Sequence, residues 1–332
     1  MALTVDLGVD ELAATRFAVS PLSETVAGLQ QLAGQDRHAV NRRWLRWAAD
    51  ALAAEPLTLS STWPLLVSEQ PGWPEFLVPA PAHAGTSIDD DLAALRDTPA
   101  RHVRASLRRV FGDAPPRAAA DLAADPAAGL RDIAAELRAA HDRLVAPHWA
   151  RIHAALDADV AHRAKRLARG GAAALFADLH PDLHWRDGRL VLEGARWRED
   201  RVVNRGPGGL VLMPVALGSP YVLIKKNTST QTTVRYPARG VAALWSTGTR
   251  TPPEATRRLL GRARAELLEA LRSPATTTDL AGALGITPSA VSQHLRVLRE
   301  NGLVTRERSG RTVRYCASAL GRALAAGPDG AP

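Results

Sequence analysis

One segment in the last third of the chain combines hydrogen-bonding side chains at helical spacing. Residues 288–298 have the period of a helix, on which Val291, Leu295 and Leu298 share one face. The opposite face carries small or hydrogen-bonding side chains, namely Ser289, Ser292, Gln293 and Arg296. Such groups can read base edges in the major groove of DNA, glutamine pairing with adenine and arginine with guanine. His294 lies between the two faces and is a weaker candidate for the same contact.

Helix start and stop signals bracket this segment. Thr287 followed by Pro288 predicts a helix start, with threonine as N-cap and proline at the first helical position. A shorter helix is predicted just before it, with Thr276 and Asp279 at capping-box spacing and Gly285 placed to end it. Two short helices joined in this way predict a helix-turn-helix.

A basic hairpin is predicted directly after the second helix. Asn301-Gly302 closes the helix, and residues 303–308 and 311–315 have the pattern of two strands around a Ser309-Gly310 turn. The hairpin contains four arginines, Arg306, Arg308, Arg311 and Arg314. Arginines beside a recognition helix can contact phosphates or reach the minor groove, so we assign phosphate contacts to them and to Thr287.

The run from Leu280 to Val304 resembles the winged-helix core of the ArsR-type regulators. Its most characteristic part is Ser-Gln-His-Leu-Arg-Val-Leu at 292–298, followed by Gly-Leu-Val at 302–304. The resemblance covers roughly residues 257–320 and implies a dimeric repressor or activator that binds a near-palindromic operator. The first domain resembles an uncharacterised N-terminal region found on some ArsR-like proteins of high-GC bacteria, which implies no function.

The chain departs from the metal-sensing members of that family. Residues 276–285 contain no cysteine or histidine, and the terminal helix, at most residues 317–326, contains no His, Asp or Glu. Cys316 is the only cysteine, and a small buried apolar role is the commoner one for it. We therefore expect no metal and no cofactor. The terminal helix is also short, so we expect dimerisation to use a predicted helix at 254–271 and the first domain.

The net charge is concentrated in the same region. Residues 257–322 hold 12 arginines against five acidic residues, which gives +7 of the total +8. An excess confined to one fifth of the chain is expected of a segment that faces a polyanion. A basic face that is merely solvated remains the alternative.

Composition limits the class of protein. A length of 332 residues predicts two domains, and a single cysteine excludes a disulfide within the chain. No secretory signal is visible at the N-terminus, and no apolar run approaches the roughly 18–20 residues needed to span a bilayer. We expect a cytoplasmic protein with no membrane contact.

The first 250 residues predict an α+β domain that is mostly helical with a small antiparallel sheet. Helices are predicted at 21–33, 36–54, 89–96, 100–111, 128–145 and from 147 to about 169. Residues 68–85 have the composition of an irregular surface segment. Short β-rich runs begin near His184, and Asp187-Gly188 predicts a hairpin turn between 183–186 and 189–193.

These patterns define a domain plan. An α+β domain of unknown function occupies 1–250, a polar linker 247–253, and a winged helix-turn-helix domain 254–325. Residues 327–332 are expected to be a disordered tail.

Candidate chemistry in the first domain is weak. Nine histidines lie there, but neither the pair His180 and His184 nor the pair His148 and His153 has the spacing of a zinc enzyme motif. The glycines at 206–209 lack the Gly-Lys-Ser/Thr ending of a phosphate-binding loop. We favour a domain that senses a small-molecule effector or mediates dimerisation. An enzyme fused to a DNA-binding domain, and a winged helix used only for protein assembly, are the alternatives.

The sequence therefore predicts a homodimeric transcriptional regulator that is not an enzyme and has double-stranded DNA as its partner.

Overall fold

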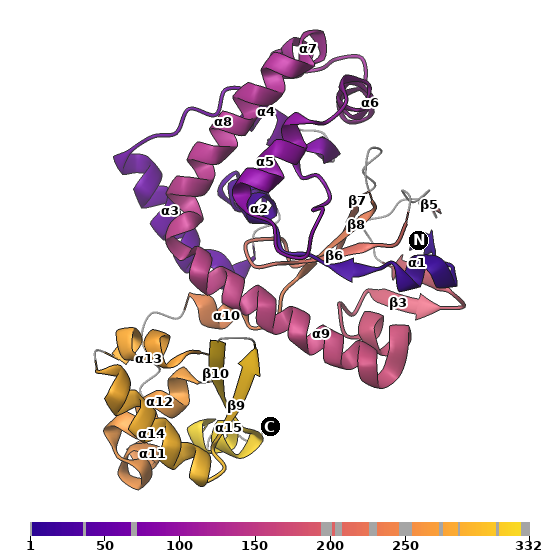
Figure 1. The fold of residues 1–332 in the computed structure, drawn as a ribbon. Coiled ribbons are helices and arrows are strands. Elements are labelled where there is room, and N and C mark those ends of the chain that lie inside the picture. The colour runs from indigo at the N-terminus through magenta and orange to yellow at the C-terminus, as the bar shows by residue number, and fades with distance from the viewer. Residues whose placement is uncertain are drawn as a thin grey trace. The chain divides into compact units, whose positions relative to one another are not determined.

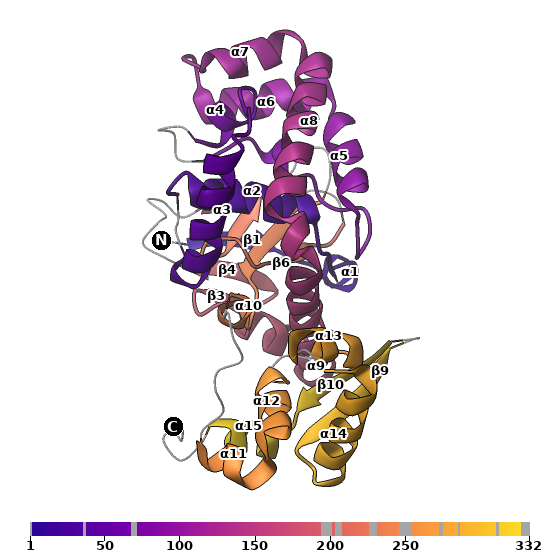
Figure 2. The same ribbon diagram turned by 90° about the vertical axis from the view of Figure 1, so that its left-hand side faces the viewer.

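The structure is a computed structural model, shown in Figures 1 and 2. It describes residues 2–35, 38–67, 72–193, 201–202, 208–225, 231–245, 254–271, 275–284, 286–309 and 312–326. The chain divides into two units, Met1–Val241 and Ala242–Pro332, which are treated separately below. Helices and small sheets occur together, so the α+β class predicted from the sequence is confirmed. None of the described helices is long and apolar enough to cross a membrane.

The first unit contains most of the helices. They are α1 (Val9–Ala13), α2 (Pro21–Leu32), α3 (Arg42–Ala54), α4 (Trp63–Leu66), α5 (Ile88–Arg96), α6 (Ala100–Phe111), α7 (Arg117–Ala124), α8 (Pro126–Leu144), α9 (Trp149–Ala177) and, across the unit boundary, α10 (Val241–Leu244). Short 3-10 turns lie at η1 (Ala39–Asn41), η2 (Glu75–Leu77) and η3 (Ala146–His148). In Figure 1 α8 runs alongside α2 and α5, against which it packs.

The helix starts follow from polar caps in the sequence. The Ser20 hydroxyl accepts a hydrogen bond from the Ser23 N–H at the start of α2, and Ser87 with Asp90 forms a capping box at the start of α5. The backbone of α9 is non-helical at Gly170 and Gly171, where the φ of Gly171 is +64°. The first helical segment thus ends where the sequence predicts, near residue 169, and a second segment continues to Ala177.

Two four-stranded sheets complete the first unit. One has the order β3 (Leu183–Arg186), β4 (Arg189–Glu193), β1 (Ala2–Asp6), β5 (Arg201–Val202). The other has the order β2 (Arg16–Phe17), β6 (Val211–Val215), β8 (Thr233–Pro237), β7 (Leu223–Lys225). Asp187 and Gly188 have φ values of +51° and +74°, so the predicted hairpin turn between β3 and β4 is confirmed.

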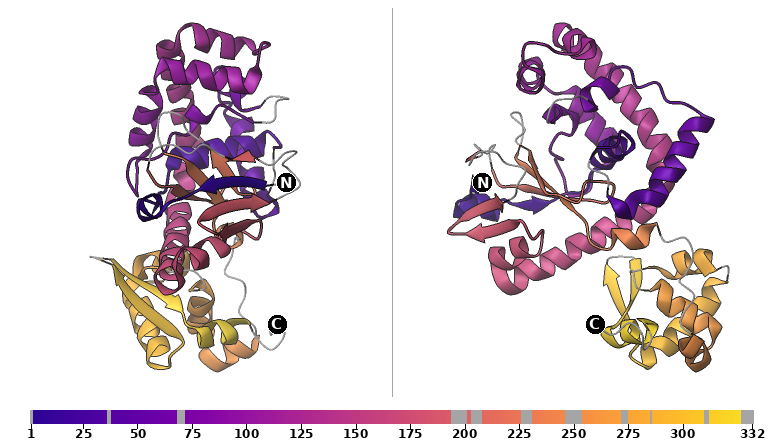
Figure 3. Two further views of the ribbon diagram at one scale, coloured as in Figure 1. Left: turned by 90° about the vertical axis from the view of Figure 1, so that its right-hand side faces the viewer. Right: turned by 180° about the vertical axis from the view of Figure 1, so that it is seen from behind.

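The sheets also contain pairings that the sequence pattern does not predict. The N-terminal strand β1 pairs antiparallel with β4, and Figure 3 shows this indigo strand among the pink and orange ones. The pairs β1–β5, β2–β6 and β6–β8 are parallel. Both sheets are therefore mixed: the N-terminal strands β1 and β2 pair with β4 and β6, while the antiparallel pairs β3–β4 and β7–β8 stay adjacent.

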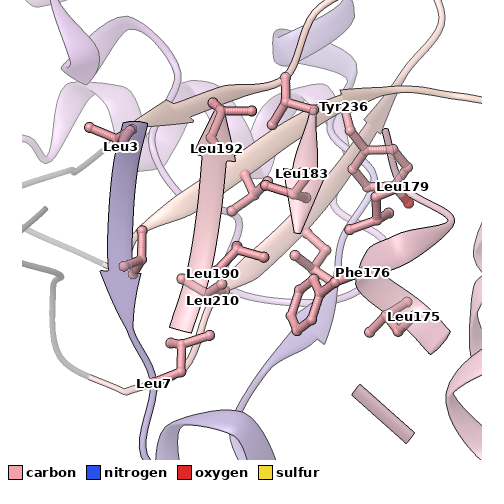
Figure 4. Packing of buried hydrophobic residues seen from close by; sticks show 14 residues of the cluster. Leu3, Leu7, Leu175, Phe176, Leu179, Leu183, Leu190, Leu192, Leu210 and Tyr236 are labelled. Atoms are coloured by element: carbon pink, nitrogen blue, oxygen red, sulfur yellow. The ribbon is translucent and has the colours of Figure 1, made fainter. Parts of the chain in front are cut away.

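An apolar core is formed by side chains from both sheets and from the end of α9, as Figure 4 shows. Phe176 from α9 stacks on Trp185 of β3 with ring centroids 5.2 Å apart. The buried members of this core are Leu3, Val5, Leu7, Leu175, Phe176, Leu179, Leu183, Leu190, Leu192, Leu210, Leu212, Val222, Val234 and Tyr236.

The expectation that residues 68–85 lie at the surface is corrected by the structure. Its described part, from residue 72, buries Trp73, Phe76, Leu77 and Val78, each at most 6% exposed. Burial of apolar side chains does not require a regular backbone, and here a single 3-10 turn, η2, carries two of them.

The second unit comprises α11 (Glu254–Leu260), α12 (Arg262–Ala270), α13 (Thr277–Leu284), α14 (Pro288–Glu300), β9 (Val304–Ser309), β10 (Thr312–Ala317) and α15 (Ala319–Ala326). The single helix expected at 254–271 is wrong. Gly261 has a φ of +78° and separates α11 from α12, because this left-handed conformation interrupts the helical hydrogen-bond ladder. The expected linker at 247–253 and tail at 327–332 lie outside the described residues.

Candidate nucleic-acid interface

The ends of α14 are fixed by local hydrogen bonds. The Thr287 hydroxyl accepts a hydrogen bond of 3.2 Å from the Ala290 N–H, and Pro288 occupies the first turn, as predicted. At the other end, the N–H of Gly302 donates to the Arg299 carbonyl and that of Leu303 to the Leu298 carbonyl, each at 2.9 Å. With Gly302 at a φ of +69°, this pair of bonds forms a Schellman motif.

Packing then decides which face of α14 meets solvent. Val291, Leu295 and Leu298 are at most 1% exposed and belong to the core of the second unit. That core consists of Leu267, Leu268, Leu271, Leu280, Ala281, Val291, Leu295, Leu298, Leu303, Val304, Ala317 and Ala325. Because one face of α14 is held there, its orientation within the unit is fixed.

The opposite face of α14 is open to solvent at the predicted positions. Exposed side chains there are Ser289, Ser292, Gln293 and Arg296, whereas His294 is half-buried. The structure therefore brings the four predicted residues together on one surface. Their contact with bases stays a prediction.

One feature of this face involves an acid that sequence reasoning missed. The Arg296 Nε donates to the Glu300 Oε1 at 3.1 Å, and the two side chains are 75% and 56% exposed. An exposed i,i+4 pair of this kind contributes only about 0.3–0.5 kcal/mol, so Arg296 can exchange this partner for another acceptor at low cost. Arg299 is also exposed, one turn after Arg296. The i, i+3 and i, i+4 spacings from Arg296 are the signals that could have found both residues.

The hairpin after α14 is confirmed, and its register separates the arginines. Strands β9 and β10 pair antiparallel, with Arg306 opposite Tyr315, Arg308 opposite Val313 and Arg314 opposite Glu307. Because positions alternate along a strand, Arg306 and Arg308 occupy positions of one face and Arg314 a position of the other. Arg306 is exposed, and Arg311 lies outside the described residues.

Backbone hydrogen bonds attach the hairpin to the rest of the unit. Ala275 and Tyr315 exchange two bonds of 3.0 and 2.9 Å, and the Ala317 N–H donates to the Leu271 carbonyl at 2.8 Å. Gly321 of α15 lies so close to this junction that a Cβ there would stand 2.1 Å from the Leu303 carbonyl oxygen. The wing is therefore fixed relative to α14 through the same core.

The residues considered for metal binding or catalysis have ordinary surroundings. Within the described ranges, no group of three or more His, Cys, Asp or Glu side chains could hold a metal ion. Cys316 is a half-buried thiol on β10. The His180 Nε2 lies 3.0 Å from the Pro220 carbonyl, and the His184 Nε2 lies 3.6 Å from a Glu193 carboxylate oxygen. The expected absence of metal and cofactor stays a prediction.

The second unit matches a known family. Residues 262–306 match the bacterial regulatory protein, arsR family, and this range contains α12, α13, α14 and the start of β9. Residues 262–306 form an ArsR-family helix-turn-helix domain. Residues 82–242 match a family of unknown function (DUF5937), which assigns no activity to the first unit.

Two individual proteins match short stretches of the chain. The chain is 51% identical over 53 residues to the HTH-type transcriptional regulator NmtR of Mycobacterium tuberculosis (strain ATCC 25618 / H37Rv), which covers 16% of this chain and 44% of that protein. The chain thus spans less than half the length of this curated relative. A crystal structure titled as a possible transcriptional regulator for arsenical resistance matches with 33% identity and a TM-score of 0.18, over 24% of this chain and 77% of that one.

Proposed function

We propose that this protein is a sequence-specific, DNA-binding transcriptional regulator. The observation that carries the proposal is the exposed face of α14, where Ser289, Ser292, Gln293 and Arg296 stand on a helix fixed at both ends and along its buried side. A recognition helix requires this combination, because base edges are read by side chains whose backbone must not move. The match of residues 262–306 to the arsR family supports the same function, and so does the similarity of the chain to a relative named as an HTH-type transcriptional regulator.

The surface residues divide into two roles in this proposal. Gln293 and Arg296 contact base edges, with Ser289 and Ser292 beside them, while His294 contributes less because it is half-buried. Phosphate contacts come from Thr287, near the helix N-terminus, and from the wing arginines Arg306, Arg308, Arg311 and Arg314. Base contacts set the sequence preference, and phosphate contacts set the general affinity and its dependence on salt.

We also propose that the protein acts as a homodimer in the cytoplasm. Among the described residues of the second unit, two large apolar side chains are exposed, Leu259 on α11 at 69% and Leu320 on α15 at 61%. The two helices are joined where the Thr256 hydroxyl donates to the Leu324 carbonyl at 2.9 Å. A second copy that covers these leucines would place two recognition helices on an inverted repeat.

For the first unit we propose a sensing or dimerising role rather than catalysis. The pair His180 and His184 has partners within the unit, namely the Pro220 carbonyl and the Glu193 carboxylate. A ligand bound to this unit would act by favouring one of two DNA-binding states. An enzyme fused to the ArsR-family domain is the alternative from another class.

Binding selection from a random duplex pool, with the full chain and sequencing as readout, tests the central proposal. We expect enrichment of an inverted repeat and its loss in the Gln293→Ala/Arg296→Ala double variant. Arg117→Ala is the matched control, because that arginine lies in the first unit with a side chain 95% exposed. If the folded chain enriches no sequence and shows no salt-dependent affinity for any duplex, the winged helix serves protein assembly instead.

A further inference from the structure

A group of basic side chains lies on one face of the β2-β6-β8-β7 sheet. Strand register aligns Arg16 of β2 with Val211, Thr233 and Lys225 across the sheet, and Arg235 follows two positions along β8. Alternation along the strands therefore assigns the three basic residues to a common face. The other face holds Leu212, Val234 and Tyr236 and packs into the apolar core.

Arg235 is the most deeply buried of these residues. It is 3% exposed, and its Nη2 donates to the Ser23 carbonyl at 3.1 Å. Its Nε and Nη1 have no hydrogen-bond partner among the described residues. A guanidinium has five N–H donors and keeps its charge in proteins, so a buried one with unmet donors costs several kcal/mol unless an anion completes it.

Lys225 and Trp73 lie next to Arg235. The Lys225 Nζ is 4.3 Å from the centroid of the Trp73 ring and 3.5 Å from the Trp73 carbonyl oxygen, and the Arg235 Cζ is 5.6 Å from the same centroid. Two cations thus share one indole ring, which attracts each of them but offers no negative charge to neutralise either. Lys225 is half-buried, whereas Trp73 is 6% exposed.

Nearby carboxylates are already engaged elsewhere. The Glu24 carboxylate accepts hydrogen bonds from the N–H groups of Ala216 and Leu217, both at 2.8 Å. Glu75 forms a salt bridge with Arg109. Among the described residues, neither Lys225 nor Arg235 has a carboxylate oxygen within 4.0 Å, and Glu75 and Glu24 act on them only at longer range.

The pKa values of these groups have the same cause. Burial raises the pKa of Glu24 to about 7, although the two backbone N–H groups and the charge of Arg235 oppose the shift. Burial lowers the pKa of Lys225 to about 8, and the charges of Arg235 and Arg109 add to the decrease, whereas Glu75 opposes it. A bound anion would offset the cost of keeping two cations in this low-dielectric environment.

We infer that Arg235 and Lys225, with Trp73 beside them, form a binding site for a small organic anion that bears a carboxylate or phosphate group. The anion accepts hydrogen bonds from the unpartnered Arg235 nitrogens and from the Lys225 ammonium. The Trp73 ring holds the two cations next to each other through its contacts with both. The inference names the ligand class for the sensing role, and that regulatory meaning rests on the proposed function.

Calorimetric titration and thermal melting of the full chain, without DNA, test the site. The probes are sodium benzoate for the carboxylate class and inorganic phosphate for the phosphate class, with sodium chloride at matched ionic strength as the baseline. We expect saturable binding of at least one probe and a rise in Tm that chloride does not give. Lys225→Met should weaken that binding at least tenfold, and Arg117→Met, the exposed control, should leave it unchanged.

Arg235→Met is the second variant and separates a ligand site from a packing role. We expect it to melt at or above the temperature of the wild type without anion and to lose the anion-induced rise, because it removes the buried unmet donors. If Arg235→Met fails to fold, Lys225→Met alone decides. The inference is overturned if neither probe binds saturably, or if Lys225→Met lowers Tm and keeps the wild-type affinity. Since no DNA is present, either outcome leaves the proposed DNA binding to be judged by the duplex selection.

Discussion

Arg296→Ala tests the proposed base contact most directly. The Arg296 side chain is 75% exposed, and its hydrogen bond to a side chain is the one with Glu300 at 3.1 Å. Removal of this pair costs the fold about 0.3–0.5 kcal/mol, and the better helix propensity of alanine offsets part of that loss. The Tm should therefore stay within about 2 °C of the wild type, so that changes in DNA binding report on contacts rather than on folding.

The expected effect on DNA binding is much larger than the effect on stability. A good arginine contact to guanine contributes about 1–3 kcal/mol of discrimination, which corresponds to a loss of roughly 5- to 150-fold on the selected duplex. For binding to a random duplex, the variant differs from the wild type only by the loss of one positive charge. Its affinity there should fall only modestly, and the slope of log K against log salt should flatten by about 0.9.

Fluorescence anisotropy with the selected duplex and a scrambled duplex, at three salt concentrations, measures both effects. Glu300→Gln is the matched control, because it keeps Arg296 and removes the negative charge of its partner. This control should bind the selected duplex as tightly as the wild type or more tightly. Equal losses on both duplexes for Arg296→Ala, or a loss of the same size for Glu300→Gln, would refute base reading by Arg296.

Three further predictions address the wing, the packing of the second unit and the pH dependence of stability. Arg311→Ala should weaken binding to the selected and the scrambled duplex by similar factors and flatten the slope of log K against log salt, because a phosphate contact carries no sequence information. Anisotropy at several salt concentrations measures both effects, and a loss of affinity for the selected duplex alone would contradict this prediction. Gly321→Ala should lower the free energy of unfolding by about 1–3 kcal/mol in urea denaturation, because a Cβ 2.1 Å from the Leu303 carbonyl oxygen outweighs the gain of about 1 kcal/mol in helix propensity. Glu24, whose pKa is about 7 in the folded chain against an ordinary 4.5, ionises first in the unfolded chain, so stability should fall by up to about 3 kcal/mol from pH 4.5 to pH 7. Glu24→Gln should flatten this decline when urea denaturation is repeated across that range, and an unchanged slope would show that other groups cause it.

Local signals explain why the second unit was largely predictable. Thr287, Pro288 and Gly302 set the ends of α14, and the spacing of its apolar residues sets the buried face. Each of these signals acts over one or two helical turns, so no distant part of the chain is needed to interpret it. Gly261 shows the limit, because helical periodicity runs through residues 254–271 while the backbone reverses its φ at that glycine.

The first unit was predictable only where its pairing is local. The β3–β4 hairpin follows from Asp187-Gly188, which are adjacent in the chain. By contrast, β1 pairs with β4 and β5, which lie roughly 190 residues later in the chain. The residues around β1 give no local signal that identifies these partners. The burial of the segment around Trp73 was missed for the same reason, since its apolar side chains are covered by residues distant in the sequence.

The sequence by itself determined the helix-turn-helix, its wing and the positive charge of that region, because caps, turns and periodicity are encoded in neighbouring residues. Only the tertiary structure decided that Arg235 and Lys225 share one face of a sheet beside Trp73. Strand register brings together residues from β7, β8 and the segment near η2, and burial then removes the water that would otherwise satisfy their charges. Burial and charge at such a site are properties of the folded chain, and no short segment carries them.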